Sequence, residues 1–222
     1  MKLKHIFDLD HTLYPDPADK YERYARANQR ALADMNVTMD FETVKRLGTQ
    51  SFKERGDQLL VFVEDYGLDY AVLNKLYHGY AVEEFKDGIT LKPSIRDYFN
   101  QIAKEDKVIL THATSDWAHS ILQGLGMADN LYAEHVLAQD HPSINYIRKD
   151  DMINGEQIFR TALEVLQARA EDTVMYEDVA ANLIIPKKLG MKTVLVHWGA
   201  APDRKADHVD VMVADVSGYK PR

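Results

Sequence analysis

The stretch Phe7-Asp8-Leu9-Asp10-His11-Thr12-Leu13 decides how the rest of the sequence is interpreted. It continues an apolar run, Leu3 to Phe7, that is typical of a short buried strand. Side chains alternate along a strand, so Asp8 and Asp10 can point the same way. In an open parallel sheet the functional edge is the one formed by the carboxyl ends of the strands. The stretch therefore predicts two carboxylates in one pocket at the end of the first strand.

Two carboxylates this close together need a compensating charge, either a cation or a proton held by one of them. Mg²⁺ is the natural hard cation, because it binds one or two carboxylates together with a substrate phosphate. A carboxylate can also attack phosphorus, while a second one protonates the leaving group and then activates water. The alternative is that Asp8 and Asp10 belong only to a turn or a helix cap. The pair alone does not decide between these interpretations.

Short apolar runs alternate with longer helical patterns along the chain, which predicts an α/β protein with a Rossmann-like parallel sheet flanked by helices. The expected strands are Leu3–Phe7, Lys107–Leu110, Thr173–Tyr176, Lys192–Val196 and Val209–Val213. The expected helices between them are Ser115–Leu125, Glu156–Ala168 and Ala180–Lys188. Gly124 and Gly126 indicate the end of the first of these helices, and Gly190 the end of the last.

Between residues 16 and 88 the alternation of apolar runs and helical patterns stops, and no run there is typical of a strand. Consecutive amphipathic helices are expected over Ala18–Met35, Asp40–Leu47, Ser51–Tyr66 and Asp69–Phe85. We therefore expect a core domain made of residues 1–15 and 89–222, with an inserted helical cap domain at 16–88.

Two later strand ends carry polar residues that fit the same pocket. The run Val108-Ile109-Leu110 ends in Thr111, whose hydroxyl can hold a phosphate oxygen, although it can equally be a helix-boundary residue. The run before Glu177 and Asp178 ends in two adjacent acids. These acids can complete a metal site or can simply interact with a helix dipole.

Composition limits the classes of partner. The 222-residue chain has a formal net charge of -8, which argues against binding to nucleic acid polymers or anionic membranes. It contains no cysteine and no apolar run near the ~20 residues needed to cross a bilayer. From the composition we expect a soluble, cytoplasmic protein, and composition says nothing about its chemistry. The pocket residues, not the composition, lead us to expect a small phosphorylated metabolite as partner, bound by a monomer or homodimer.

Three motifs together resemble the haloacid dehalogenase superfamily: the segments 7–14, 110–112 and 176–183. The segments 157–163 and 188–196 also resemble its core, and all occur in the family's order. The helical insert resembles the small cap of many phosphatases of this superfamily. The sequence His-Thr-Leu-Tyr-Pro at 11–15 is most similar to a subgroup related to pyrimidine 5′-nucleotidases.

The resemblance implies a role for each residue of the pocket. Asp8 is implied as the nucleophile, and Asp10 as the general acid/base that also lends its backbone carbonyl to Mg²⁺. Thr111 is implied to bind the transferring phosphoryl group, and Asp178 to ligate the metal with Glu177 beside it. Haloacid dehalogenases proper lack an acid/base aspartate at the second position, so Asp10 favours phosphoryl transfer.

The sequence departs from the family pattern in two places. His112 stands where Asn or a small polar residue is usual, so it is expected either to reach the substrate or to make a supporting hydrogen bond. Ile153 stands where the family has a phosphate-neutralising Lys. Without a fixed cation a phosphoryl-transfer site loses charge stabilisation. We expect Lys149 to be the substitute, with Arg148 next, unless both belong to a solvated charge cluster.

Substrate recognition is expected in the helical insert, because caps close over the substrate and exclude water. Lys53 and Arg55, with Ser51 and Phe52, form a polar patch near an expected helix start, although exposed helix surface explains it too. Trp117 and His119 are expected to be packing residues rather than ligands. Tyr14, with Pro15, lies at the core-to-cap junction, where a hinge is plausible.

Three functions remain open at this point. The first is Mg²⁺-dependent hydrolysis of a small phosphomonoester, with a nucleoside 5′-monophosphate as the first choice, through an aspartyl-phosphate on Asp8. The second is a sugar phosphomutase with the same nucleophile, cap and metal site. The third is a phosphate- or nucleotide-binding regulator with weak catalysis, which only the missing Lys at position 153 supports.

Overall fold

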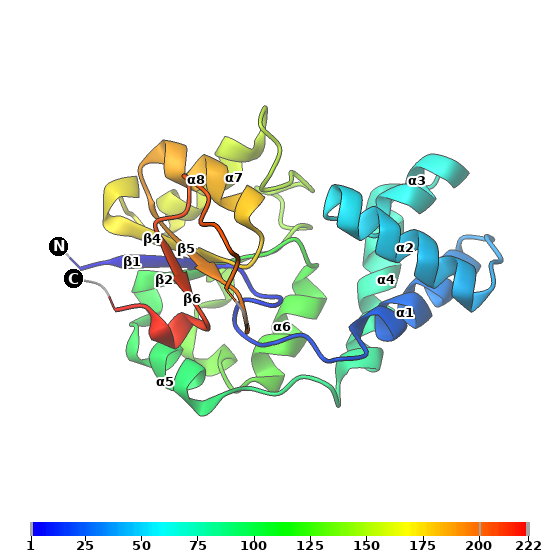
Figure 1. Ribbon diagram of the computed structural model, residues 1–222, viewed down its shortest axis with the longest axis horizontal. Coiled ribbons are helices and arrows are strands. Elements are labelled where there is room, and N and C mark those ends of the chain that lie inside the picture. The colour runs from blue at the N-terminus through cyan, green and yellow to red at the C-terminus, as the bar shows by residue number, and fades with distance from the viewer. Residues whose placement is uncertain (1, 200, 221–222) are drawn as a thin grey trace. The chain divides into compact units, whose positions relative to one another are not determined.

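The computed structural model describes residues 2–199 and 201–220 (Figure 1). The chain folds into two compact units, which are described separately below. One consists of Met1–Pro15 and Thr90–Arg222, and the other of Asp16–Ile89. Within the described ranges, no helix combines the length and the apolarity needed to span a membrane.

The first unit is built on a six-stranded sheet in the order β3-β2-β1-β4-β5-β6, and every neighbouring pair is parallel. Its strands are β1 (Lys4–Phe7), β2 (Lys107–Leu110), β3 (Val136–Leu137), β4 (Thr173–Glu177), β5 (Lys192–Val196) and β6 (Val211–Val213). The predicted α/β class with a parallel sheet is confirmed. Because β1 lies between β2 and β4, the residues that follow these three strands meet at one edge of the sheet.

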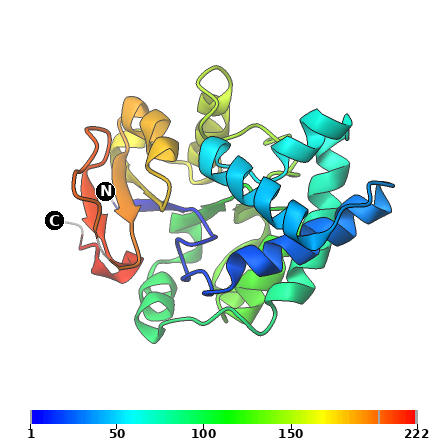
Figure 2. The ribbon, with the colours of Figure 1, turned by 45° about the vertical axis from the view of Figure 1, so that its right-hand side comes forward.

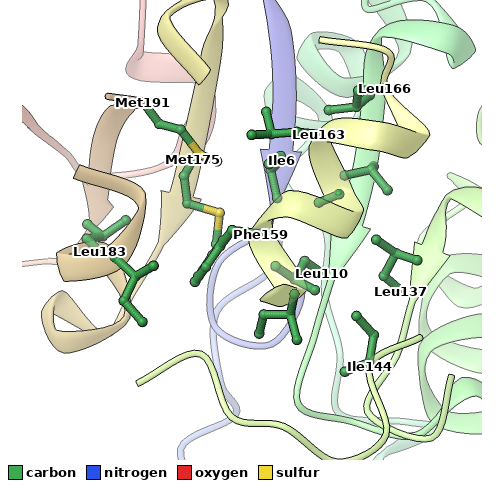
Figure 3. Packing of buried hydrophobic residues seen from close by; sticks show 14 of the residues in the cluster. Ile6, Leu110, Leu137, Ile144, Phe159, Leu163, Leu166, Met175, Leu183 and Met191 are labelled. Carbon is green, nitrogen blue, oxygen red and sulfur yellow. The ribbon is translucent and has the colours of Figure 1, made fainter. Parts of the chain in front are cut away.

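One face of this sheet is covered by α7 (Gly155–Val165) and α8 (Ile184–Leu189). Figure 3 shows Phe159 and Leu163 of α7 packed over Ile6 and Leu110 of the sheet. All four of these side chains are buried, and each contributes about 1.5–3 kcal/mol through the apolar surface it removes from water. This core fixes β1 and β2 and therefore the position of the strand ends.

The opposite face is covered by α5 (Pro93–Gln101) and α6 (Ser115–Gly124), which Figure 1 shows on the other side of the sheet from α7 and α8. Its packing is aromatic. The ring of Phe7 stacks on Tyr176 with centroids 4.5 Å apart and contacts Phe99 of α5 at 5.5 Å. Offset aromatic pairs add about 0.5–1.5 kcal/mol beyond their buried area.

The second unit is entirely helical: α1 (Lys20–Asp34), α2 (Phe41–Arg55), α3 (Leu60–Tyr66) and α4 (Tyr70–Phe85), seen at another angle in Figure 2. The helix α1 packs against both α2 and α4. Two aspartates begin helices by accepting a backbone N–H, Asp40 from Thr43 and Asp69 from Val72. Such caps contribute about 1 kcal/mol each.

The structure corrects the expected element boundaries in this helical unit. The single helix predicted over Ser51–Tyr66 is wrong, because α2 continues through Ser51 to Arg55 and α3 begins only at Leu60. Gly56 ends α2 in a left-handed conformation, with φ 67°, and donates its N–H to Phe52. The two helices are therefore separated by a glycine-terminated turn.

Further differences lie in the first unit. The short strand β3 and the helix α5 were not predicted, and the helix expected from Ala180 begins as a 3-10 turn, Ala180–Leu183, before α8. The remaining 3-10 turns are Lys104–Asp106, Ala128–Asn130, Ala133–His135, Ala170–Asp172 and Val216–Gly218.

Candidate active site

The carboxyl ends of β2, β1 and β4 bring the polar residues of the three motifs to one edge of the sheet. Asp8 directly follows β1 and donates its backbone N–H to Tyr176 at 2.9 Å, which continues the sheet pairing. Thr111 directly follows β2, and Glu177 is the last residue of β4. The strand order therefore places these residues on neighbouring positions of the edge.

A single helical turn follows β1 and organises both aspartates. The N–H of Leu13 donates to the carbonyl of Leu9 at 3.0 Å, so residues four apart lie on the same side of the turn. The Thr12 hydroxyl donates to Asp8 Oδ2 at 2.9 Å, and the Tyr14 hydroxyl donates to Asp10 Oδ1. Each carboxylate is thus held by the residue four positions later.

Asp8 lies in a buried ionic cluster. The Nζ of Lys149 is 2.5 Å from Asp8 Oδ1 and 2.9 Å from Glu177 Oε2. Lys149 and Glu177 are each only 1% exposed, and Asp8 is 5% exposed. One ammonium therefore faces two carboxylates in a place where water does not screen their charges.

The charges in this cluster shift the pKa values of its members. Burial raises the pKa of Asp8 and the Glu177 carboxylate raises it further, against the opposing effect of Lys149. Burial disfavours the charged form of Lys149, but Asp8 and Glu177 outweigh it and raise the pKa of Lys149. The ammonium is therefore retained, and two carboxyl groups share this one fixed cation.

Asp10 has a separate set of donors from those of Asp8. The indole N–H of Trp117 donates to Asp10 Oδ1 at 2.7 Å, the same oxygen that accepts from Tyr14. The hydroxyl of Thr111 lies 3.4 Å from Asp10 Oδ2 and itself accepts the N–H of Ala113 at 3.0 Å. The second aspartate is therefore oriented independently of the first.

Lys149 reaches the cluster from the loop between β3 and α7. Its backbone N–H donates to His112 Nε2 at 2.8 Å. Ile153, which stands at the family's usual Lys position, is 89% exposed. Burial, with the positive charges of Lys149 and Arg148, holds the pKa of His112 well below its usual value, so the ring is neutral and can accept this bond.

The acidic residues of this edge fit a divalent cation. Asp8, Glu177 and Asp178 each offer a carboxylate oxygen, and these atoms lie within 4.8 Å of one another. Oxygen donors are what Mg²⁺ prefers, and this group brings three carboxyl groups together, two of them beside the one ammonium. The Asp10 carboxylate is not in this group.

The two residues expected to bind substrate in the helical insert lie in the last turn of α2 rather than near a helix start. Arg55 forms an ion pair with Glu64 of α3 at 2.5 Å. Lys53 lines a hollow on α2 together with Arg46 and Glu54.

Three partners of the aspartates were not predicted from the sequence: Thr12, Tyr14 and Trp117. The spacing of four residues from Asp8 to Thr12 and from Asp10 to Tyr14 is a signal that a turn brings them together. Trp117 is buried, as expected of a packing residue, but it also donates to a carboxylate 107 positions earlier in the sequence. Local spacing carries no signal for such a contact.

Comparisons with known proteins agree with this fold. No curated protein matches the chain by sequence. CbbY from Rhodobacter sphaeroides is similar in structure, with a TM-score of 0.69 and 18% identity over 98% of this chain and 96% of that one. A haloacid dehalogenase phosphatase from Thermococcus onnurineus has a TM-score of 0.64 and 15% identity over 97% and 94%. A hydrolase from Pseudomonas syringae has a TM-score of 0.60 and 15% identity over 96% and 94%.

The model of one protein family, the haloacid dehalogenase-like hydrolases, matches residues 6–190. The match runs from β1 through α8 and includes every residue of the buried cluster. The prediction of an enzyme from this superfamily is confirmed, whereas the pyrimidine 5′-nucleotidase-like subgroup stays a prediction. The chain belongs to the haloacid dehalogenase-like hydrolase family.

Proposed function

We propose that the chain is a Mg²⁺-dependent phosphatase that hydrolyses a small phosphomonoester through an aspartyl-phosphate on Asp8. The observation that carries the proposal is the pairing of two carboxylates with different surroundings. Asp8 contacts a buried ammonium, and Asp10 is held by neutral donors on another side of the turn. Two carboxylates with such different surroundings can take different roles, one as the nucleophile and the other as the general acid/base.

In the first step, an oxygen of Asp8 attacks phosphorus while the bond from phosphorus to the ester oxygen breaks. Asp10 in its protonated form gives its proton to the departing alkoxide. In the second step, Asp10 takes a proton from water, and this water attacks the phosphorus of the aspartyl-phosphate. Phosphate leaves, and both aspartates return to their starting states.

Lys149 and Thr111 supply the fixed positive charge and the hydroxyl for the transferring group. The ammonium already lies beside Asp8, where charge develops on the phosphoryl oxygens during transfer. A donor that is in place before the reaction costs no reorganisation during it. Thr111, next to Asp10, is the proposed hydroxyl donor to a phosphoryl oxygen.

Asp8, Glu177 and Asp178 are the proposed side-chain ligands of Mg²⁺, with the backbone carbonyl of Asp10 as a further one. When bound, the cation neutralises charge on the phosphate and orients it. Asp178 directly follows Glu177 at the end of β4, so the sheet holds both ligands close to Asp8.

The substrate class is a small phosphorylated metabolite. A nucleoside 5′-monophosphate is the first choice from the motif at residues 11–15. Sugar phosphates form the competing class, because structures of CbbY contain phosphate in one case and xylulose-1,5-bisphosphate in a mutant. At 15–18% identity these neighbours do not decide the substrate, so both classes belong in one panel.

The regulator alternative rested on Ile153, where a Lys was expected. Lys149 offers a cation to Asp8 from elsewhere in the chain, which favours the catalytic proposal over this alternative. A phosphomutase would share every residue named above. It is distinguished by isomerisation that needs a phosphorylated activator and exceeds the release of phosphate.

The proposal is tested by assaying the purified chain on an aryl phosphate and on a panel of nucleotides and sugar phosphates, with Mg²⁺ and with a chelator. We expect turnover with Mg²⁺, its loss with the chelator, and a decrease on the order of 10³-fold or more in Asp8→Asn. Wild-type turnover in Asp8→Asn would show that Asp8 is not the nucleophile.

A further inference from the structure

We propose that His112 is a positioning residue that holds Lys149 against Asp8. The inference rests on the proposed function and deepens it, because it explains how this chain supplies the cation of its phosphate site. It also connects the two departures from the family pattern, a histidine at position 112 and a lysine at 149 in place of one at 153.

The contact is between the histidine ring and the backbone of the lysine, not its side chain. The N–H of Lys149 donates to His112 Nε2 at 2.8 Å, while Nζ of the same residue extends to Asp8 and Glu177. One hydrogen bond therefore fixes the base of the side chain whose tip is in the ionic cluster. His112 lies two residues after the end of β2, and Thr111 between them donates its N–H to the Leu137 carbonyl of β3, so the anchor lies close to the sheet.

Lys149 needs such an anchor because it belongs to no helix or strand. Two successive residues before it, Asn145 and Tyr146, have left-handed backbones, with φ 48° and 60°. A lysine side chain loses up to about 2 kcal/mol of rotamer freedom when it is fixed, and a loop backbone adds to this cost. A neutral ring acceptor close to the end of β2 limits the positions that the Lys149 backbone, and therefore its ammonium, can take.

A second observation shows that the loop is built closely around this position. Gly155, the first residue of α7, lies so near that an added Cβ would come 2.9 Å from the Arg148 carbonyl and 3.2 Å from the Lys149 carbonyl. The backbone of Lys149 is therefore confined by His112 at its N–H and by Gly155 at its carbonyl.

Asn, the usual family residue at this position, has a shorter side chain than His. A Lys at the family's usual position, which corresponds to Ile153 two residues before α7, would not need an anchor at the backbone of residue 149. We infer that the longer imidazole at 112 accompanies the relocated lysine. Gln is the substitution whose side-chain oxygen best replaces the acceptor that His112 provides at Nε2. Leu keeps similar bulk without an acceptor.

The test is a double-mutant cycle on aryl phosphate turnover, with the variants His112→Leu, Lys149→Met and the two combined. If His112 acts through Lys149, His112→Leu lowers kcat about 10- to 100-fold. Lys149→Met lowers kcat about 100- to 1,000-fold. The double variant then has the same kcat as Lys149→Met, because the anchored group is already gone. Multiplicative losses in the double variant would overturn the inference.

His112→Gln is the rescue variant, and we expect it to recover most of the kcat lost in His112→Leu. Equal loss in His112→Gln and His112→Leu would show that the acceptor does not matter. His119→Leu is the matched control, since His119 lies exposed on α6, and it should retain wild-type kcat. Thermal unfolding of every variant separates loss of positioning from loss of fold.

Failure of the proposed function gives a different result from failure of the positioning role. If the wild type hydrolyses no phosphomonoester, the proposed function is wrong, and the cycle is repeated with binding of orthovanadate as the readout. Coupling between His112→Leu and Lys149→Met in vanadate affinity supports the positioning role, and independent effects contradict it.

Discussion

At the residue scale, the two aspartates of the opening segment differ in what they contact. Asp8 faces the buried ammonium of Lys149, whereas Asp10 accepts hydrogen bonds from Tyr14 and Trp117 on a single oxygen. Those donors hold the carboxylate in one orientation. The proposed acid/base therefore depends on residues that have no proton-transfer role of their own.

Removing these donors tests their contribution. We expect Trp117→Phe and Tyr14→Phe each to lower kcat about 10-fold or more, because Asp10 loses a fixed partner while the ring still fills its space. Steady-state kinetics on an aryl phosphate measures the effect. Tyr132→Phe is the control, because Tyr132 is 41% exposed and its ring packs against His135. Unchanged kcat in both buried variants would contradict the orienting role.

His5 gives a stability prediction at the same scale. Burial lowers the pKa of His5 to about 4, against 6.5 for an exposed histidine. Its Nδ1 lies 3.1 Å from the Tyr176 hydroxyl, and its ring stacks on Phe7. Between pH 6.5 and 4 the unfolded chain binds the proton and the folded chain does not, so stability falls as the pH falls.

The loss from His5 amounts to about 2 kcal/mol between pH 7 and pH 5 and continues toward pH 4. Urea unfolding at pH 7 and pH 5 measures it, and His5→Phe should show a smaller decrease between the two pH values than the wild type. The exposed variant His119→Leu should keep the wild-type decrease. An equal decrease in His5→Phe and the wild type would mean that His5 does not bind the proton as described.

Part of the site was predictable from single residues. Asp8, Asp10, Thr111, Glu177 and Asp178 all follow apolar runs, and parallel strands bring their carboxyl ends together, so their proximity could be expected. The contacts of Lys149 and Trp117 could not be derived from spacing. Lys149 reaches Asp8 across 141 positions and Trp117 reaches Asp10 across 107, and only the folded chain defines such pairs.

At the scale of elements, five of the six strands were predicted, including the three-residue β6 within the expected range Val209–Val213, and the two-residue β3 was not. β1, β2, β4 and β5 match their predicted ranges within one residue. β3 has only two residues, too few for a periodic pattern, and pairs with β2 through its backbone. The end of α2 at Gly56 was not predicted, because the amphipathic pattern continues from α2 into α3. The left-handed backbone of Gly56 that separates the two helices leaves no trace in that pattern.

The loop that carries Lys149 joins α7 at Gly155, and a substitution there tests how closely the loop and the helix pack. Gly155→Ala should lower kcat and reduce stability by about 1–3 kcal/mol, because its Cβ would come within 2.9 Å of both the Arg148 carbonyl and Ile185 Cδ1. Urea unfolding and aryl phosphate turnover measure the two effects.

Gly79→Ala is the matched control for this substitution. Gly79 is exposed within α4 and has no neighbouring atoms within 4 Å of an added Cβ. The change should therefore stabilise the protein by about 0.5–1 kcal/mol. A stable and fully active Gly155→Ala variant would contradict the close fit of the loop.

At the scale of the whole molecule, a parallel sheet and a helical unit are encoded by one chain, with the helical residues inserted directly after the first strand segment. The sheet unit contains every residue of the proposed nucleophile and metal site. Binding of Mg²⁺ to this unit should therefore stabilise the fold, since a ligand that binds only the folded state shifts the unfolding equilibrium.

We expect saturating Mg²⁺ to raise the melting temperature by several degrees, on the order of 5 °C for about 2.7 kcal/mol of binding free energy at 100-fold excess over Kd. Asp178→Asn should abolish most of this increase, whereas Asp129→Asn, at an exposed acid, should keep it. An increase of equal size in Asp178→Asn would place the cation elsewhere.

The central claim is that Asp8 becomes covalently phosphorylated during turnover. The most direct measurement is mass spectrometry of peptides from enzyme that is mixed with excess phosphomonoester and Mg²⁺ and then quenched within the first turnovers. We expect a peptide containing Asp8 that is heavier by one phosphoryl group, that loses this group to hydroxylamine, and that is absent in Asp8→Asn. Active turnover with unmodified Asp8 at every quench time, or a phosphoryl group on another residue, would contradict the account.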